Sequence, residues 1–215
     1  MNVKDFNHRY IPAKGANAPT LLLLHGTGGN EDSLIDLGQQ LVPEAAILSP
    51  RGKVLENGYP RFFRRLAEGV FDEADLKART HELADWVESA VTAYGIDPAS
   101  LVAVGYSNGA NIAASMLLLR PGVVPRAVLL RAMFPLQPEP FPQLSGTDVL
   151  ISAGRMDGMI PQVSTEKLAG ILREAGAEVK LTWLNVDHGL VYDDLHGAQR
   201  WIAETAARHP RTIES

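Results

Sequence analysis

The chain has 215 residues, of which 46% are hydrophobic and 21% are charged, a composition typical of globular proteins. Its formal net charge of −5 argues against nucleic-acid binding, and the absence of cysteine excludes disulfides, thiolate metal sites and a cysteine nucleophile. The sequence has neither a signal-peptide pattern nor an apolar run of the roughly 20 residues that cross a bilayer. We therefore expect a single cytoplasmic domain over residues 1–215 without a membrane span.

Predicted strands and helices alternate along the chain, which indicates an α/β fold with a mostly parallel sheet. In chain order we expect a weak strand at 6–12, a buried strand at 20–26, a helix at 32–42 capped by Asp32 or Ser33, a strand at 45–50, a long connection, an amphipathic helix at 73–94, a strand at 101–106, a helix at 108–119, strands at 126–133 and 147–154, a helix at 164–176, a strand at 179–186 and a helix at 193–208.

One long connection, residues 51–72, interrupts this alternation. Loops longer than about 15 residues are uncommon and are usually functional or disordered. We predict that Phe62, Phe63 and Arg64 bind substrate, the aromatic rings as walls and the arginine as a partner for an anionic group. Further candidates for the same roles are Phe71, Arg51, Arg61 and Arg65. The alternative is that the phenylalanines anchor the loop to the core and the arginines face water.

Ser107 lies in the turn between a predicted strand and a predicted helix, within the stretch Gly105-Tyr106-Ser107-Asn108-Gly109. This is a G-x-S-x-G pattern, in which a serine on a sharp turn presents its hydroxyl above the sheet and small flanking residues avoid clashes. The alternative is a serine that only caps the helix. The strand before the pattern and the helix after it favour a nucleophile.

A serine nucleophile needs a general base and an acid that orients the base. His188 follows the last predicted strand and Asp157 follows the strand before it, so both lie at carboxyl ends of strands, where the serine turn also lies. Asp187 adjoins His188 but is a poor candidate for the orienting acid, because neighbouring loop side chains tend to diverge. We predict a Ser107–His188–Asp157 triad.

The remaining histidines carry no comparable pattern. His8, His81, His196 and His209 fall in terminal or helical segments and are most simply solvated, and no pair of them has the spacing of a metal site. Asp193 and Asp194 are expected to start the final helix, where acidic residues suit the helix dipole. We predict no bound metal.

A second glycine-rich turn, His25-Gly26-Thr27-Gly28-Gly29, follows the strand at 20–26. A phosphate cradle is excluded because the G-x-G-x-x-G pattern would need glycine at Glu31 and because acidic residues follow. The other interpretation is an oxyanion loop, with the backbone amides of Thr27 and Asn108 as donors. His25 is then a packing residue.

Four stretches in this order resemble the phospholipase/carboxylesterase group of α/β-hydrolases, to which acyl-protein thioesterases and small bacterial carboxylesterases belong. They are LLLLHGTGGNE at 21–31, GYSNGANIA at 105–113, AGRMDGMIP at 153–161 and DHGL at 187–190. The resemblance implies the α/β-hydrolase fold, with a mostly parallel sheet, helices on both faces and no large lid domain. It also implies Ser107, Asp157 and His188 as the triad, Thr27 and Asn108 as oxyanion donors, and ester or thioester hydrolysis without a cofactor.

Two features separate the chain from particular relatives. Acyl-protein thioesterases carry a tryptophan-phenylalanine-aspartate motif where this chain has RFFRR at residues 61–65, and dienelactone hydrolases use a cysteine nucleophile that is absent here. The RFFRR segment resembles that of a bacterial subgroup linked to aromatic and quinone metabolism, which suggests aryl esters.

We therefore predict a serine hydrolase that cleaves small-molecule carboxylic esters, with short acyl or aryl groups, through an acyl-enzyme. An open site without a full lid favours short acyl chains. The alternatives are a thioesterase or a lysophospholipase on the same triad and, from another class, a non-catalytic ligand receptor. The oligomeric state stays open, with a homodimer among the options.

Overall fold

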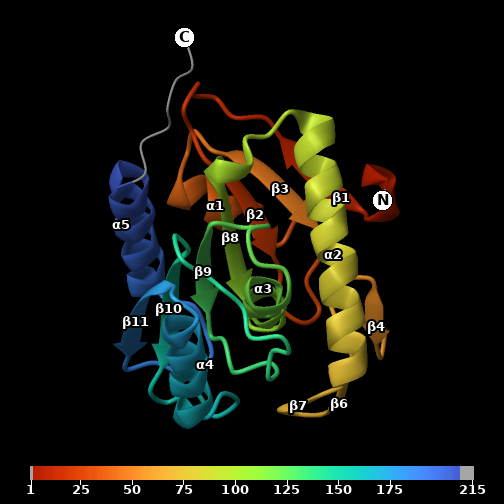
Figure 1. Ribbon diagram of the computed structural model, residues 1–215, viewed down its shortest axis with the longest axis vertical. Coiled ribbons are helices and arrows are strands. Elements are labelled where there is room, and N and C mark those ends of the chain that lie inside the picture. The colour runs from red at the N-terminus through yellow and green to blue at the C-terminus, as the bar shows by residue number, and fades with distance from the viewer. Residues whose placement is uncertain (1, 209–215) are drawn as a thin grey trace.

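A seven-stranded sheet forms the centre of the computed structural model, which describes residues 2–208 (Figure 1). The strands, in spatial order, are β1 (His8–Ile11), β3 (Ala46–Pro50), β2 (Thr20–Leu24), β8 (Leu101–Tyr106), β9 (Arg126–Leu130), β10 (Asp148–Gly154) and β11 (Glu178–Leu184). β1 pairs antiparallel with β3, and all other neighbours are parallel. The predicted mostly parallel sheet is confirmed.

Five α-helices in the described chain cover the two faces of the sheet. They are α1 (Ile35–Leu41), α2 (Glu73–Tyr94), α3 (Asn108–Leu119), α4 (Gln162–Glu174) and α5 (Tyr192–Arg208), with short 3-10 helices at Val3–Asp5 and Pro98–Ser100. Alternate strand residues belong to different cores: Leu22 and Leu24 pack with residues of α2, α3 and α4, whereas Leu21 and Leu23 pack with residues of α1 and α5. Because both faces are covered, the central strands are buried along their whole length and apolar at most positions.

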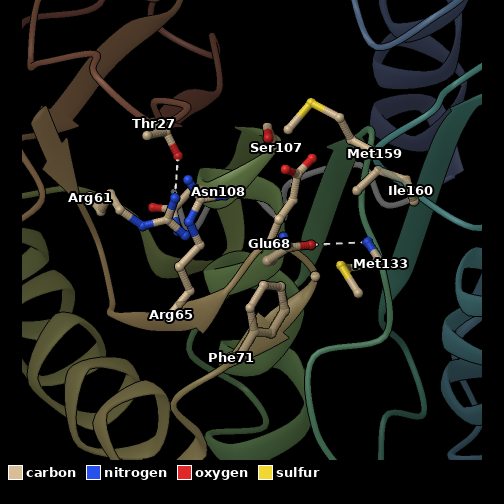
Figure 2. Close-up of a pocket in the computed structure, with 12 residues that line it drawn as sticks. Thr27, Arg61, Arg65, Glu68, Phe71, Ser107, Asn108, Met133, Met159 and Ile160 are labelled. Atoms are coloured by element: carbon tan, nitrogen blue, oxygen red, sulfur yellow. Dashed lines mark hydrogen bonds between the residues drawn. The ribbon is translucent and has the colours of Figure 1, made fainter. Parts of the chain in front are cut away.

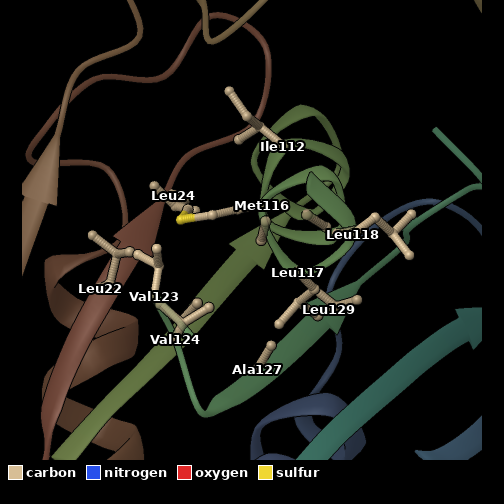
Figure 3. Close-up of a cluster of buried hydrophobic side chains, with 14 of the residues drawn as sticks. Leu22, Leu24, Ile112, Met116, Leu117, Leu118, Val123, Val124, Ala127 and Leu129 are labelled. Atoms are coloured by element: carbon tan, nitrogen blue, oxygen red, sulfur yellow. The ribbon is translucent and has the colours of Figure 1, made fainter. Parts of the chain in front are cut away.

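Helix α3 is the most deeply buried of the helices. Its residues from Asn108 to Leu118 are all buried, and Figure 3 shows its side chains lying against those of β2 and β9. Small residues such as Ala110, Ala113 and Ala114 allow this close approach to the sheet. The helix that follows Ser107 is therefore held rigidly by the core, and so is the turn from which it starts.

The long connection at 51–72 contains regular structure that the sequence did not indicate. It forms two antiparallel hairpins, one from β4 (Val54–Glu56) and β5 (Tyr59–Arg61) and one from β6 (Arg65–Ala67) and β7 (Val70–Phe71). These strands have two or three residues each and lack the longer alternating pattern that makes a strand visible in sequence.

The cap expected for the first helix is wrong. α1 begins at Ile35 with Leu34 at the capping position, where no side chain accepts a hydrogen bond. The Asp32 carboxylate accepts a hydrogen bond from Arg9 Nε at 2.7 Å, and the Ser33 hydroxyl accepts one from the Asn30 amide. Both side chains stabilise the loop before the helix instead.

The loops at the carboxyl ends of the parallel strands bring the predicted site together. Thr27 follows β2, Ser107 follows β8, Asp157 follows β10 and His188 follows β11. Because these strands run parallel, all four residues lie at one edge of the sheet, which is where open α/β sheets bind ligands.

Candidate active site

Ser107 occupies a sharp turn with an unusual backbone conformation. Its φ of 52° and ψ of −112° lie outside the regions that non-glycine residues favour. Although Ser107 stands at the capping position of α3, its side chain accepts no capping hydrogen bond. The interpretation of Ser107 as a simple helix cap is therefore wrong, and strain of this kind is characteristic of functional sites.

The flanking glycines make this turn sterically feasible. A Cβ atom on Gly105 would lie 2.6 Å from the carbonyl oxygen of Gly109, and one on Gly109 would lie 1.9 Å from the carbonyl oxygen of Leu24. Both distances are far below van der Waals contact, and the atoms that would be met belong to the backbone. The strand, the turn and the helix thus pack more closely than any side chain at these two positions would permit.

A chain of hydrogen bonds joins the three residues predicted as the triad. His188 Nε2 lies 2.9 Å from Ser107 Oγ, and His188 Nδ1 lies 2.7 Å from Asp157 Oδ2. A carboxylate only accepts hydrogen bonds, so the proton of the neutral imidazole is on Nδ1 and Nε2 is the acceptor for the serine hydroxyl. This arrangement leaves Nε2 ready to take the hydroxyl proton.

Asp157 is fixed independently of His188. Its Oδ1 accepts hydrogen bonds from the amides of Met159 at 2.8 Å and Ile160 at 3.1 Å, and only 1% of its side chain is exposed. The neighbouring Asp187 binds elsewhere, since its Oδ1 accepts from the Gly189 amide at 2.8 Å. The carboxylate that meets the imidazole is thus that of Asp157.

Thr27 and Asn108 lie beside Ser107 at the wall of one pocket (Figure 2). Within residues 2–208 the backbone amide of neither residue has a hydrogen-bond acceptor. The amide of Asn108 belongs to the first turn of α3, where amides lack intrahelical partners and partial positive charge accumulates. Both amides are therefore free to bind a negatively charged oxygen.

The hairpin segment ties these two residues together through its own hydrogen bonds. Arg61 Nη1 donates to Thr27 Oγ1 at 2.6 Å, and the Gly28 amide donates to the Pro60 carbonyl at 2.9 Å. On the other side the Phe62 amide donates to Asn108 Oδ1 at 2.8 Å. Residues 60–62 thus bridge the glycine-rich turn after β2 and the start of α3.

His25 holds the base of the same turn. Its Nδ1 lies 2.7 Å from the carbonyl oxygen of Gly26, and its Nε2 accepts from the Gly52 amide at 3.0 Å. Burial lowers the pKa of His25, because the charged imidazole would lose its hydration. A neutral His25 with its proton on Nδ1 satisfies both partners, so this residue has a structural role and is more than the packing residue expected from sequence.

The pocket beside Ser107 is small, with a volume of about 40 Å³. A buried water needs roughly 10–15 Å³ of such space, so the pocket holds a few waters or a short chain. In Figure 2, Arg61 and Arg65 border it on the side of Thr27 and Asn108, and methionines border the opposite side. The lining residues are Thr27, Arg61, Arg65, Glu68, Gly69, Phe71, Ser107, Asn108, Asn111, Met133, Met159 and Ile160.

Three residues predicted to bind substrate lie outside this lining. Phe62 and Phe63 are buried in the core, and Arg64 points to solvent and donates to the Asp72 carboxylate at 2.7 Å. The two phenylalanines anchor the long connection and Arg64 faces water, as the alternative interpretation expected for these three residues. Phe62 packs on the His25 ring and Phe63 on the Phe71 ring, at centroid distances of 4.6 and 4.9 Å.

Among the other candidates of the long connection, Phe71, Arg61 and Arg65 do line the pocket, whereas Arg51 pairs with Glu31. Arg65 donates two-pronged hydrogen bonds to Glu56, and these bonds lower the pKa of that carboxyl. Arg61 is buried beside the same carboxylate, at 3.4 Å. The arginines that face the pocket are therefore already partnered by an acid.

Sequence reasoning missed the far wall of the pocket. Asn111, Met133, Met159 and Ile160 line it, although the sequence motifs, which contain all of these residues except Met133, assigned them no role. One signal was available for Asn111, which lies one helical turn after Ser107 and therefore shares its face of α3. The Asn111 Oδ1 accepts from the Met133 amide at 2.9 Å and so fixes the loop after β9.

The other histidines are not near this site. His81 and His196 are exposed as expected, and His209 lies outside the described residues. His8 is half-buried rather than solvated, with Nε2 2.7 Å from the Tyr94 hydroxyl. Over residues 2–208 no cluster of three or more His, Cys, Asp or Glu side chains could hold a metal ion. In the same range no helix is long and apolar enough to cross a membrane.

Known proteins resemble this chain over nearly its whole length. The family model described as Phospholipase/Carboxylesterase matches residues 7–206. A Bacillus subtilis (strain 168) protein named "Putative hydrolase MhqD" is 43% identical over 196 residues, which cover 91% of this chain and 98% of that protein. Both matches span nearly the whole described chain.

Solved structures with this fold include two named carboxylesterases. The Bacillus cereus carboxylesterase superposes with a TM-score of 0.90 at 44% identity and covers 93% of this chain and 94% of its own. The carboxylesterase from Mesorhizobium loti has a TM-score of 0.87 at 32% identity, over 92% and 94% of the two chains. The chain therefore belongs to the phospholipase/carboxylesterase family of α/β-hydrolases.

Proposed function

We propose that this protein is a serine carboxylesterase that uses Ser107, His188 and Asp157 as a catalytic triad. The observation that carries the proposal is the continuous hydrogen-bond chain from Ser107 Oγ through the His188 ring to Asp157, located beside a pocket with two unpaired backbone amides. The names of the related carboxylesterases support the same reaction class.

In the proposed mechanism the ester carbonyl enters the pocket above Ser107. Ser107 Oγ attacks the carbonyl carbon while His188 Nε2 takes the hydroxyl proton, and Asp157 stabilises the resulting imidazolium. The carbonyl oxygen becomes an oxyanion that accepts hydrogen bonds from the amides of Thr27 and Asn108. Each such donor contributes on the order of 2.7–4 kcal/mol to transition-state stabilisation.

The tetrahedral intermediate then collapses. The bond to the alcohol oxygen breaks, His188 returns its proton to that oxygen, and the acyl group stays on Ser107 as an ester. A water molecule activated by His188 attacks this acyl-enzyme and releases the carboxylic acid, which regenerates the Ser107 hydroxyl. The reaction needs only water and the groups of this chain.

For the substrate we propose esters with short acyl groups and, on the alcohol side, aryl groups. The pocket volume of about 40 Å³ favours a short acyl group over a long one, and the side chains of Phe71, Met133 and Ile160 give the pocket an apolar wall. The exposed Met159 extends this apolar surface to the mouth, where a ring could lie.

The experiment that tests the function compares wild type with Ser107→Ala on 4-nitrophenyl acetate. The variant should fold normally and hydrolyse the ester at the background rate, whereas retained turnover would remove Ser107 from the mechanism. Rapid labelling of wild type by a fluorophosphonate separates an enzyme from a non-catalytic receptor, because only an activated serine reacts quickly.

A panel of 4-nitrophenyl esters from acetyl to palmitoyl tests the substrate class. We expect kcat/KM to be higher for acetyl to hexanoyl esters than for palmitoyl esters. A steady rise toward long chains would favour a lysophospholipase or a protein thioesterase instead. Matching thioesters with the same acyl groups distinguish esterase from thioesterase.

A further inference from the structure

Arg131 is an unusual residue for its position. It directly follows β9, its side chain is fully buried, and its backbone has a φ of 59°, in the left-handed region that non-glycine residues rarely occupy. A buried arginine in a strained conformation is costly in two ways, through lost hydration and through backbone energy. Neither the motifs of the sequence nor the proposed mechanism uses it.

A buried acid compensates the charge of Arg131. Asp194, in the first turn of α5, accepts from Arg131 Nη1 at 2.8 Å and from Nη2 at 2.7 Å, and 3% of its side chain is exposed. The same carboxylate accepts from the Ser152 hydroxyl at 2.6 Å and from the Val191 amide at 2.9 Å. Asp194 was expected only to favour the helix dipole, and instead it is the centre of a buried polar network.

The remaining donors of Arg131 point to the loop that carries His188. Arg131 Nε donates to the carbonyl oxygen of Asp187 at 3.2 Å, and Nη2 donates to that of Gly189 at 2.7 Å. The carbonyl between them, that of His188 itself, accepts from the Tyr106 hydroxyl at 3.1 Å. The backbone carbonyl groups of the three consecutive residues 187–189 are therefore held by the side chains of Arg131 and Tyr106.

These two side chains come from the middle of the rigid sheet. Tyr106 ends β8 immediately before Ser107, and Arg131 follows β9, the next strand. The Ser107 amide in turn donates to the carbonyl of Leu130, adjacent to Arg131. The serine turn and the loop that carries His188 are thus both held by the same two neighbouring strands, β8 and β9.

Stability alone does not account for such an arrangement. Replacing a buried ion pair by apolar residues of similar size is often neutral or stabilising, so the pair is weak evidence of a contribution to stability. In contrast, a displacement of about 1 Å between reacting groups can reduce a rate by about 10²-fold, so precise placement of the base has a large kinetic effect.

We infer that Arg131, together with Tyr106, is a positioning residue that fixes the backbone of residues 187–189 and thereby sets the distance from His188 to Ser107. This inference rests on the proposed function, in which His188 is the base. Asp194 pairs with the Arg131 guanidinium and orients it, so that its outer donors remain directed at the loop.

The test uses the double variant Arg131→Met/Asp194→Asn. It removes the hydrogen bonds from Arg131 to the carbonyls of residues 187 and 189 without leaving a buried charge unpaired. With 4-nitrophenyl acetate we expect kcat to fall by about tenfold or more while KM stays within about twofold, because the pocket lining is unchanged. The rate of fluorophosphonate labelling, which reports how well the base activates Ser107, should fall in parallel.

A second variant and a control keep the test decisive. Tyr106→Phe retains the ring but removes the bond to the His188 carbonyl, and we expect kcat to fall by about threefold. As the control, Trp86→Phe removes a hydrogen bond far from the site, from Trp86 Nε1 in α2 to the Val3 carbonyl of the N-terminal 3-10 helix. It should lower the melting temperature without lowering kcat.

Specific results would overturn the inference. They are full kcat in the double variant, a raised KM with unchanged kcat, or an equal loss of kcat in Trp86→Phe. If the double variant does not fold, unchanged kcat in Tyr106→Phe overturns it as well. Ser107→Ala separates the two proposals: turnover in that variant refutes the esterase mechanism, whereas its inactivity beside a fully active double variant refutes only the role of Arg131.

Discussion

Adding one methyl group at Gly109 tests whether close backbone packing shapes the serine turn. The Cβ of Gly109→Ala would lie 1.9 Å from the carbonyl oxygen of Leu24 and 2.6 Å from that of His25. These oxygens belong to β2 and to the start of the glycine-rich turn, and both are buried in the core. No side-chain rotation can relieve such an overlap, so α3 and β2 must separate by about 1 Å, which a close-packed interior resists.

The expected magnitude follows from this displacement. Overpacking costs about 1–3 kcal/mol, and the rigid backbone on both sides places Gly109→Ala near the upper end. For a domain of 150–250 residues, about 3 kcal/mol lowers the melting temperature by about 6–12 °C. Because the same movement separates Ser107 and Asn108 from Thr27, kcat should also fall by about 10²-fold.

The assay combines thermal unfolding with hydrolysis of 4-nitrophenyl acetate at a temperature where the variant is folded. Gly170→Ala is the matched control, since Gly170 lies within α4 and a Cβ there would meet open space. We expect the control to be stabilised by about 0.5–1 kcal/mol, because alanine favours helices over glycine, and to keep full activity. An unchanged melting temperature and kcat in Gly109→Ala would refute the reasoning.

Three further predictions follow from the site. Asp157→Asn should reduce kcat by about 10⁴-fold, the effect of losing the orienting carboxylate of a triad, whereas Asp187→Asn should be mild; steady-state kinetics showing the reverse ranking would reassign the acid. Arg61→Met should lower kcat about tenfold, because Thr27 loses the hydrogen bond that fixes its side chain, whereas the control Arg64→Ala should leave kcat unchanged. Equal kcat values in the two variants would contradict the role of Arg61 in bridging the glycine-rich turn and α3. Burial lowers the pKa of His25 in the folded state, so in acid the unfolded chain binds more protons at this residue than the folded chain does. The melting temperature should therefore decline as the pH falls below about 6.5, and it should decline less steeply in His25→Gln.

Sequence reasoning identified the fold and the three residues of the hydrogen-bond chain because both depend on local patterns. Short apolar runs separated by helices predict a parallel sheet, and a parallel sheet places every residue that follows a strand at one edge. Ser107, Asp157 and His188 could thus be assigned to one edge before any distance was known. Asp187 lies at the same edge and could be set aside on a different ground, because the side chains of neighbouring loop residues such as Asp187 and His188 tend to diverge.

The pocket lining could not be predicted in the same way because it depends on contacts between distant segments. The long connection contains arginines and phenylalanines side by side, and composition alone does not say which of them turn inward. In the structure Arg61 is buried against Thr27, whereas Arg64, three residues later, faces solvent. The pairing of β4 with β5 decides this, and hairpins of three residues leave little trace in a sequence.

Two of the buried arginines, Arg61 and Arg131, have corresponding roles in the architecture. Arg61 holds the glycine-rich turn that carries Thr27, and Arg131 holds the loop that carries His188. Loops are the most mobile parts of a fold, yet the proposed reaction requires them to keep fixed distances to Ser107. An arginine suits this task because its rigid fork of five donors can bind several carbonyl or hydroxyl oxygens at once. A carboxylate lies beside each guanidinium, Glu56 for Arg61 and Asp194 for Arg131, so that the charge can stay buried while the outer donors hold the loop.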